Sequence, residues 1–145
     1  MIDEKLYRTM IYGILDQGAP SVGSDGKSAY RGLGGLRSPV GFLIDDDLYI
    51  GQPYIENWEP SSPAVCTIVG NSVGVRVSMR QEGVLHEIED AHNQSIDSDD
   101  FIRDFIEALV FYAKAAPFDT NQTALYMMEK WCQENERVYD FPGLY

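Results

Sequence analysis

Several kinds of residue are scarce in this sequence, and each scarcity narrows the classes of protein that it can encode. The 145 residues include two cysteines, Cys66 and Cys132, which form no C-x-x-C pair, so neither a disulfide framework nor a zinc ribbon is expected. No apolar run approaches the ~20 residues that span a bilayer, and the charged start MIDEKLYRTM lacks an apolar signal-type stretch. We therefore expect a cytoplasmic protein that makes no membrane contact and keeps its thiols reduced.

Basic residues are also scarce: 11 lysines and arginines stand against 23 acids, for a net charge of −12. Because binding to nucleic acid needs a basic stripe, no direct nucleic-acid contact is expected. Residues 38–75 contain no lysine or arginine, yet they hold Asp45, Asp46, Asp47, Glu56 and Glu59. Residues 82–107 add nine acids, Asp97, Asp99 and Asp100 among them, against one arginine. Two interpretations stay open: a solvated surface, or an acidic face for a basic partner.

Motifs that mark catalysis are missing as well. The run Gly26-Lys27-Ser28 lacks the earlier glycine and the preceding strand of a phosphate loop. His86 and His92 are six residues apart, not the four of zinc proteases, and His92 flanks an apolar helix face, which is typical of a core histidine. Adjacent aspartates at 45–47 favour a helix cap over a cation site. We expect no cofactor and no metal, and a non-enzymatic protein more than an enzyme.

Helical periodicity is what the sequence does contain, and it predicts a mainly α (α+β) single domain over residues 1–145. Asp3 caps a first helix that ends at Gly18, and residues 76–93 and 99–115 have helical spacing. In the second of these, Phe111 projects into the polar strip. A capping box of Asp119 and Gln122 opens a last helix, whose predicted inner side holds Ala124, Leu125, Met127, Met128, Trp131 and Cys132.

Two segments are harder to interpret. Ala29-Tyr30 and residues 40–44 predict a small two-stranded β-hairpin near residues 29–44, around a glycine turn. At its base, Arg31 and Asp46 can pair with each other or serve as polar handles for a partner. Residues 61–77 are either helix or strand, because Ser62-Pro63 is a typical helix start while the following β-branched residues favour a strand.

Two separated motifs resemble a family of small phage and prophage proteins. The first runs through Tyr30-Arg31, residues 35–37 and 39–44, Asp46 and Tyr49, and is similar to Tyr-Arg…Gly-x-Lys-Cys-Ala-Val-Gly-x-Leu-Ile…Tyr. The second, Leu85, Ile88 and His92-Asn93, is similar to a downstream Leu-x-x-Ile/Leu-Gln-x-x-His-Asp helix motif. The family's Lys-Cys-Ala is Arg37-Ser38-Pro39 here, which removes its thiol, and its His-Asp is His92-Asn93, which weakens an acid–base interpretation. The resemblance implies a phage or mobile-element origin and no particular mechanism.

Three hypotheses for the function follow. The first is an acidic phage-type protein that binds a host or viral protein, such as a basic nucleic-acid-binding or defence protein, and inhibits it through the acidic face. Phe111 is a further candidate contact of that face. The second is an enzyme of unknown reaction with a shallow site at Tyr30, Arg31, Asp46 and His92. The third is a structural or self-assembling protein, a homo-oligomer with Phe111 and the last helix at its interface.

Overall fold

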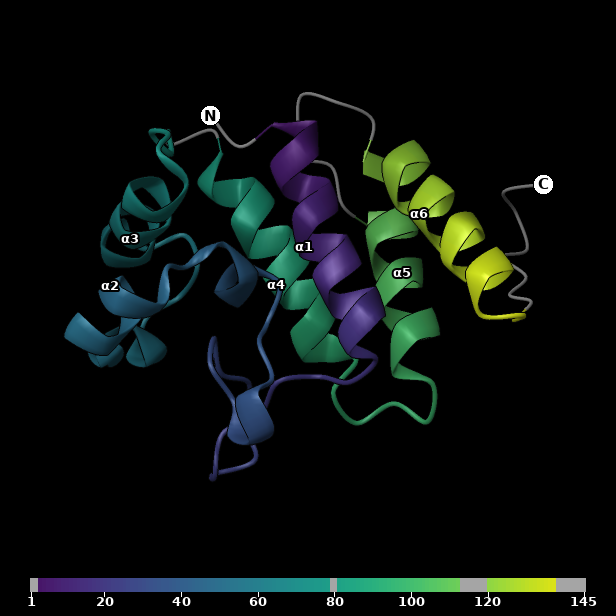
Figure 1. Cartoon of the computed structure of the whole chain (residues 1–145), viewed down its shortest axis with the longest axis horizontal. Helices are drawn as coiled ribbons and strands as arrows, with labels where there is room; N and C mark the ends of the chain where they lie inside the picture. Colours follow the sequence, from purple (N-terminus) through teal and green to yellow (C-terminus); the bar gives the residue numbers. More distant parts are fainter. Residues whose placement is uncertain (1–2, 79–80, 113–119, 138–145) are drawn as a thin grey trace.

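Helices and irregular segments alternate along the chain. The computed structural model describes residues 3–78, 81–112 and 120–137 (Figure 1). Within these ranges the elements are α1 (Glu4–Gln17), η1 (Leu33–Gly35), η2 (Val40–Leu43), α2 (Asp46–Gly51), η3 (Pro53–Asn57), α3 (Pro63–Val73), α4 (Glu82–Gln94), α5 (Phe101–Tyr112) and α6 (Thr120–Glu134), where η denotes a 3-10 helix. The predicted mainly helical class is confirmed. No helix in these ranges has the length and apolarity that crossing a membrane requires.

The ends of the helices follow from local sequence. Asp3 caps α1, because its side chain accepts a hydrogen bond from the Leu6 N–H at 2.9 Å, and Gly18 ends α1 in the left-handed conformation at φ 73°. Within residues 61–77, residues 63–73 form a helix, α3, and no strand is present. Ser62 caps α3, Pro63 occupies its first turn, and Gly74 ends it at φ 74°. The predicted helix at 76–93 is shorter than expected and begins at Glu82.

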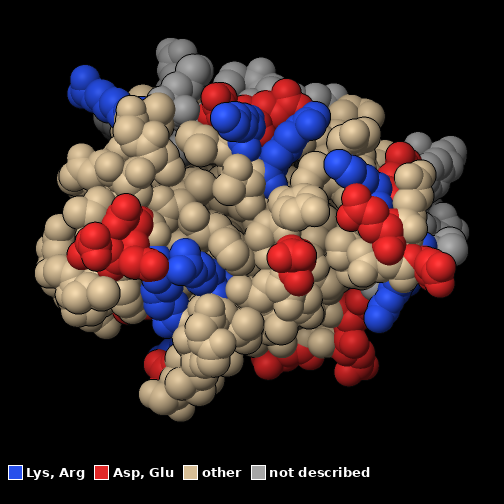
Figure 2. Space-filling view, in the orientation of Figure 1, with Lys and Arg blue, Asp and Glu red and all other residues tan. Residues whose placement is uncertain are grey.

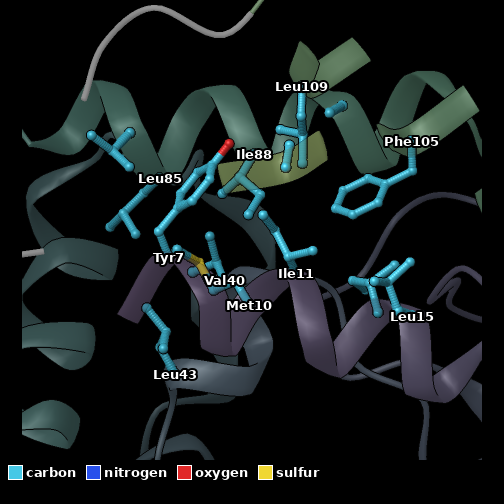
Figure 3. Packing of buried hydrophobic residues seen from close by; sticks show 14 of the residues in the cluster. Tyr7, Met10, Ile11, Leu15, Val40, Leu43, Leu85, Ile88, Phe105 and Leu109 are labelled. Atoms are coloured by element: carbon cyan, nitrogen blue, oxygen red, sulfur yellow. The ribbon is translucent and has the colours of Figure 1, made fainter. Parts of the chain in front are cut away.

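The hydrophobic core draws buried residues from α1, α3, α4, α5 and α6 and from η2 and η3. α5 packs against both α4 and α6, and α1 packs against α6 and η2. Figure 3 shows Tyr7 and Ile11 of α1 close to Ile88 of α4, with Phe105 of α5 beside them. In α6, three of the residues predicted on the inner side are buried and three are partly buried: Ala124, Met127 and Met128 in the first group, and Leu125, Trp131 and Cys132 in the second. The predicted cap Asp119 lies outside the described residues.

The β-hairpin predicted near residues 29–44 is wrong. The described chain has no strand there and forms η1 and η2, with one isolated antiparallel bridge between Arg31 and Arg37. The reason is local: Gly34 and Gly35 both take positive φ angles, of 71° and 75°, and turn the chain sharply. Pro39 then adopts helical angles and has no N–H for a ladder, so pairing cannot extend past this point.

Candidate functional site

An exposed surface at residues 45–59 combines acidic and large apolar side chains. Ile50, Tyr54 and Trp58 are 73%, 52% and 55% exposed. Exposed acids occur in the same segment. We call the exposed acids and large apolar residues of this segment the α2–η3 surface: Asp45, Asp46, Asp47, Ile50, Tyr54, Trp58 and Glu59. Large exposed apolar residues that are close together are a feature of interaction sites, so this segment is a candidate contact surface.

The acids at the start of α2 follow helix-capping chemistry. Asp45 is the N-cap, because its carboxylate accepts a hydrogen bond from the Asp47 N–H at 2.9 Å. Asp46 and Asp47 lie in the first turn, where the helix dipole favours negative charge. The predicted helix cap is therefore confirmed. In the described part of the chain, neither Asp45, Asp47 nor Glu59 forms an ion pair, so their charges face solvent.

Asp46 differs from its neighbours because two arginines neutralise it. Its carboxylate accepts hydrogen bonds from Arg31 and, at 3.0 Å, from Arg37. The bond from Arg31 holds the pKa of Asp46 below its ordinary value. Arg31 also donates to the Ile44 carbonyl at 2.6 Å and lies over the Tyr49 ring. Figure 2 shows acidic and basic groups side by side over α2. The pairing of Arg31 with Asp46 is confirmed, and this acid holds the loop in place.

Glu56, the next acid of the predicted face, is also a structural residue. Its carboxylate accepts hydrogen bonds from the backbone N–H groups of Tyr30 and Arg31, at 2.7 and 3.0 Å. It accepts a third from the Tyr49 hydroxyl at 2.7 Å. Burial and this bond raise the pKa of Tyr49 to about 12. Glu56 therefore ties η3 to residues 30–31 and has little capacity left for a partner.

The remaining acids of the predicted face lie elsewhere. Asp97, Asp99 and Asp100 belong to the loop between α4 and α5, on the opposite side of the view in Figure 1 from α2. They line a separate acidic hollow with Asp104. Phe111 is 38% exposed and lies at the other end of α5. The acids and Phe111 that the sequence places on one face thus occupy three separate places.

The four residues of the predicted shallow enzyme site do not form an open site. Tyr30 is 4% exposed, and its hydroxyl donates to the Trp58 carbonyl at 2.7 Å. His92 is fully buried; its Nε2 accepts from the Ser21 N–H at 2.9 Å, and its Nδ1 pairs with Asn93. Burial lowers the pKa of His92. Arg31 and Asp46 are bound to each other, so all four residues hold neighbouring parts of the chain together. The prediction that His92 is a core histidine is confirmed.

Glu89 is a buried acid whose contact with the backbone the sequence does not reveal. It is 3% exposed, accepts a hydrogen bond from the Val40 N–H at 3.1 Å, and its pKa is raised to about 7 by burial. Its spacing on α4 held a signal, because Glu89 falls on the same inward face as Leu85 and His92. An ionisable side chain on the apolar face of a helix either forms a hydrogen bond with a buried backbone group or has a functional role.

A small cavity is lined in part by Glu89. Its volume is about 240 Å³, and it opens between η3 and α4. Tyr30 and Glu89 form buried parts of its wall, while Trp58, Glu59 and Asn93 are exposed residues at its rim. In the described part of the chain, no three residues of the His, Cys, Asp or Glu type are arranged to hold a metal ion. The cavity therefore has the character of a polar, acidic pocket beside the α2–η3 surface.

The chain matches no protein-family model, no curated protein and no solved structure. The residues that carry the resemblance to phage proteins have structural roles here. Glu56 binds the backbone of Tyr30 and Arg31 within residues 18–60, whereas His92 binds Ser21, so the second motif fastens this segment onto α4.

Proposed function

We propose that this protein acts by binding a basic partner protein through the α2–η3 surface. The observation that supports it is the exposure of Ile50, Tyr54 and Trp58 in a segment whose solvent-facing charges are acidic. Aromatic side chains supply much of the binding free energy at protein interfaces, and surrounding charges steer the encounter. A partner with positive charges around an apolar patch is complementary to both properties.

The partner that fits this chemistry best is a nucleic-acid-binding protein. Such proteins carry the basic patches that neutralise phosphates, and an acidic protein competes for the same patches. Because the sequence resembles small phage and prophage proteins, we place the partner in a host cell, in a nucleic-acid-binding or defence complex. In this proposal the protein inhibits its partner by covering the basic surface.

The test compares capture from host lysate by the unaltered protein with capture by a variant carrying Ile50→Ser and Tyr54→Ser. Both side chains are exposed, so the variant is expected to fold with an unchanged circular dichroism spectrum. A matched control variant carries Asp97→Asn and Asp99→Asn in the separate acidic loop. We expect one basic protein to be retained by the unaltered and control proteins and lost by the Ser variant. Equal retention by all three overturns the proposal.

Salt dependence provides a second readout of the same binding. Exposed charges are screened over about 8–10 Å at physiological ionic strength, so the association rate should fall as salt is added. Asp47→Asn together with Glu59→Gln should flatten this dependence. Binding that is indifferent both to salt and to these substitutions overturns the electrostatic part of the proposal.

Self-assembly is a second candidate, favoured by exposed aromatic residues on α5 and α6. Phe111 is 38% and Tyr126 is 51% exposed. Analytical ultracentrifugation over a wide concentration range distinguishes this function. A dimer that Phe111→Ser dissociates supports it, and a monomer throughout excludes it.

A further inference from the structure

The cavity between η3 and α4 adjoins the α2–η3 surface through Trp58 and Glu59, which belong to both. We propose that it receives one arginine side chain of the basic partner. This inference rests on the proposed function, because the arginine belongs to a segment that lies across Tyr54 and Trp58. It goes further by naming a specific pocket and the chemical group that enters it.

The lining of the cavity suits a guanidinium group in three respects. Glu59 at the rim supplies an exposed carboxylate that forms no ion pair within the described residues. Trp58, which is 55% exposed, also lines the cavity, and a planar guanidinium stacks on an indole ring better than an ammonium does. The amide oxygen of Asn93 already pairs with His92 Nδ1 at 2.8 Å, and its second lone pair can accept a hydrogen bond from a guanidinium.

The buried part of the cavity adds charge that responds to a cation. Glu56 and Glu89 both line the cavity, and the Tyr30 hydroxyl there is committed to the Trp58 carbonyl. Glu89 has a pKa raised to about 7 by burial, and a bound cation lowers the pKa of a nearby carboxyl. Arginine binding therefore releases a proton from Glu89 near neutral pH, and it tightens as the pH rises from about 6 to about 8.

The size of the cavity favours a side chain over a larger ligand. Its volume of about 240 Å³ is below the ~300–1,000 Å³ range of ordinary small-molecule sites. Its lining comes from residues 28 and 30, from η3 and the residues that follow it, and from α4. Glu56 ties η3 to residues 30 and 31, and Glu89 ties α4 to residue 40. The pocket is thus formed before any partner arrives.

The test is an NMR titration of the ¹⁵N-labelled protein with Nα-acetylarginine amide as the probe. Nα-acetylcitrulline amide is the matched control ligand, because it replaces the guanidinium by a neutral group of the same shape. We expect saturable shifts of the Trp58 indole and of the Asn93 amide with the arginine probe only. Equal shifts with citrulline, or stronger binding of Nα-acetyllysine amide, overturn the assignment.

Two variants locate the binding. Glu59→Gln should weaken the arginine probe about two- to fivefold, whereas Asp97→Asn, the same charge change in the separate acidic loop, should leave it unchanged. Glu89→Gln should remove the pH dependence while retaining binding. Identical effects of Glu59→Gln and Asp97→Asn, or a pH dependence that persists in Glu89→Gln, overturn the role of the cavity.

The outcomes separate this inference from the proposed function. If the probe fails to bind while Ile50→Ser with Tyr54→Ser still abolishes partner capture, the cavity assignment is wrong and the surface proposal stands. If the probe binds as expected while partner capture is unaffected by those two substitutions, the proposed function is wrong and the cavity binds arginine in another context.

Discussion

The layer of helices α1, α4, α5 and α6 and the irregular segment at residues 18–60 are held together by different forces. In the helical layer, apolar side chains such as Ile11, Ile88 and Phe105 are fully buried, and each contributes about 1.5–3 kcal/mol by leaving water. In the irregular segment, side chains of Glu56, Glu89 and His92 bind backbone N–H groups directly. A buried backbone group without a helix or sheet partner needs such a substitute.

This difference shows which acids are available for function. The carboxylates of Glu56 and Glu89 accept hydrogen bonds from backbone N–H groups, and the carboxylate of Asp46 pairs with two arginines. Asp47 and Glu59 have no such role and remain exposed. A sequence with a net charge of −12 thus uses some of its acids as structural residues and presents others to solvent.

The largest effect is expected in the helical layer. Phe105→Ala removes a fully buried ring and should lower the free energy of unfolding by about 3–5 kcal/mol. Phe111→Ala, in the same helix but with 38% of its surface exposed, is the matched control and should change it by about 1 kcal/mol. Urea unfolding followed by circular dichroism measures both. Similar losses in the two variants would mean that α5 is not packed as described.

Glu89 should give the irregular segment a pH dependence that runs opposite to ordinary acid unfolding. Its pKa is about 7 in the folded protein against 4.5 ordinarily, so the folded state binds the proton more tightly. This contribution to stability is complete below about pH 4.5 and is lost as the pH rises through 7, by about 3 kcal/mol in total.

The variant Glu89→Gln isolates this contribution. Its amide oxygen still accepts from the Val40 N–H, and it carries no charge at any pH, so at pH 8 it should unfold at higher denaturant than the unaltered protein. Asp90→Asn, exposed on the same helix, is the control and should run parallel to the unaltered protein. A Glu89→Gln curve that is parallel as well would show that Glu89 is charged in the folded protein throughout this range.

His92→Ala should have an intermediate effect. It leaves the Ser21 N–H without its acceptor, which costs about 1–3 kcal/mol. The specific readout is hydrogen exchange at the Ser21 amide, which should accelerate. His86→Ala, exposed on the same helix, should alter neither quantity. Unchanged protection of Ser21 in His92→Ala would remove the proposed fastening of residue 21 to α4.

The smallest effect is expected at the charged pair of Arg37 and Asp46. Both side chains are partly exposed, at 32% and 62%, and such pairs contribute about 0.2–1 kcal/mol. Arg37→Gln should therefore destabilise slightly, and the difference should shrink in high salt. Arg31→Gln should cost more, because Arg31 also bonds the Ile44 carbonyl. Equal costs, or a cost that salt does not alter, would argue against this ranking.

The sequence predicted what depends on local spacing and missed what depends on distant partners. Asp3 and Gly18 identify the ends of α1 because capping acts within one turn. By contrast, the contact of His92 with Ser21 spans 71 residues, and that of Glu89 with Val40 spans 49. No periodicity encodes such pairs. The hairpin prediction is wrong for a local reason, because Gly34 and Gly35 take positive φ angles and Pro39 adopts helical angles.

For the candidate site, the sequence predicts where the acids lie along the chain but not which of them come together in space. The run of acids without a basic residue located the α2–η3 surface, and the cap at Asp45 followed from its position before α2. The grouping was not predictable, because whether Asp97 lies beside Asp47 depends on how α4 and α5 pack. Nor did composition distinguish Glu56, whose carboxylate binds backbone, from Glu59, whose carboxylate faces solvent.

Hydrogen exchange of the protein, alone and with its captured partner, tests the proposed binding surface most directly. If the partner lies on the α2–η3 surface, amides of residues 45–59 should gain protection while those of residues 95–107 remain unchanged. Protection confined to the α4–α5 loop or to α6, with residues 45–59 exchanging as in the free protein, would place the partner elsewhere and refute the proposal.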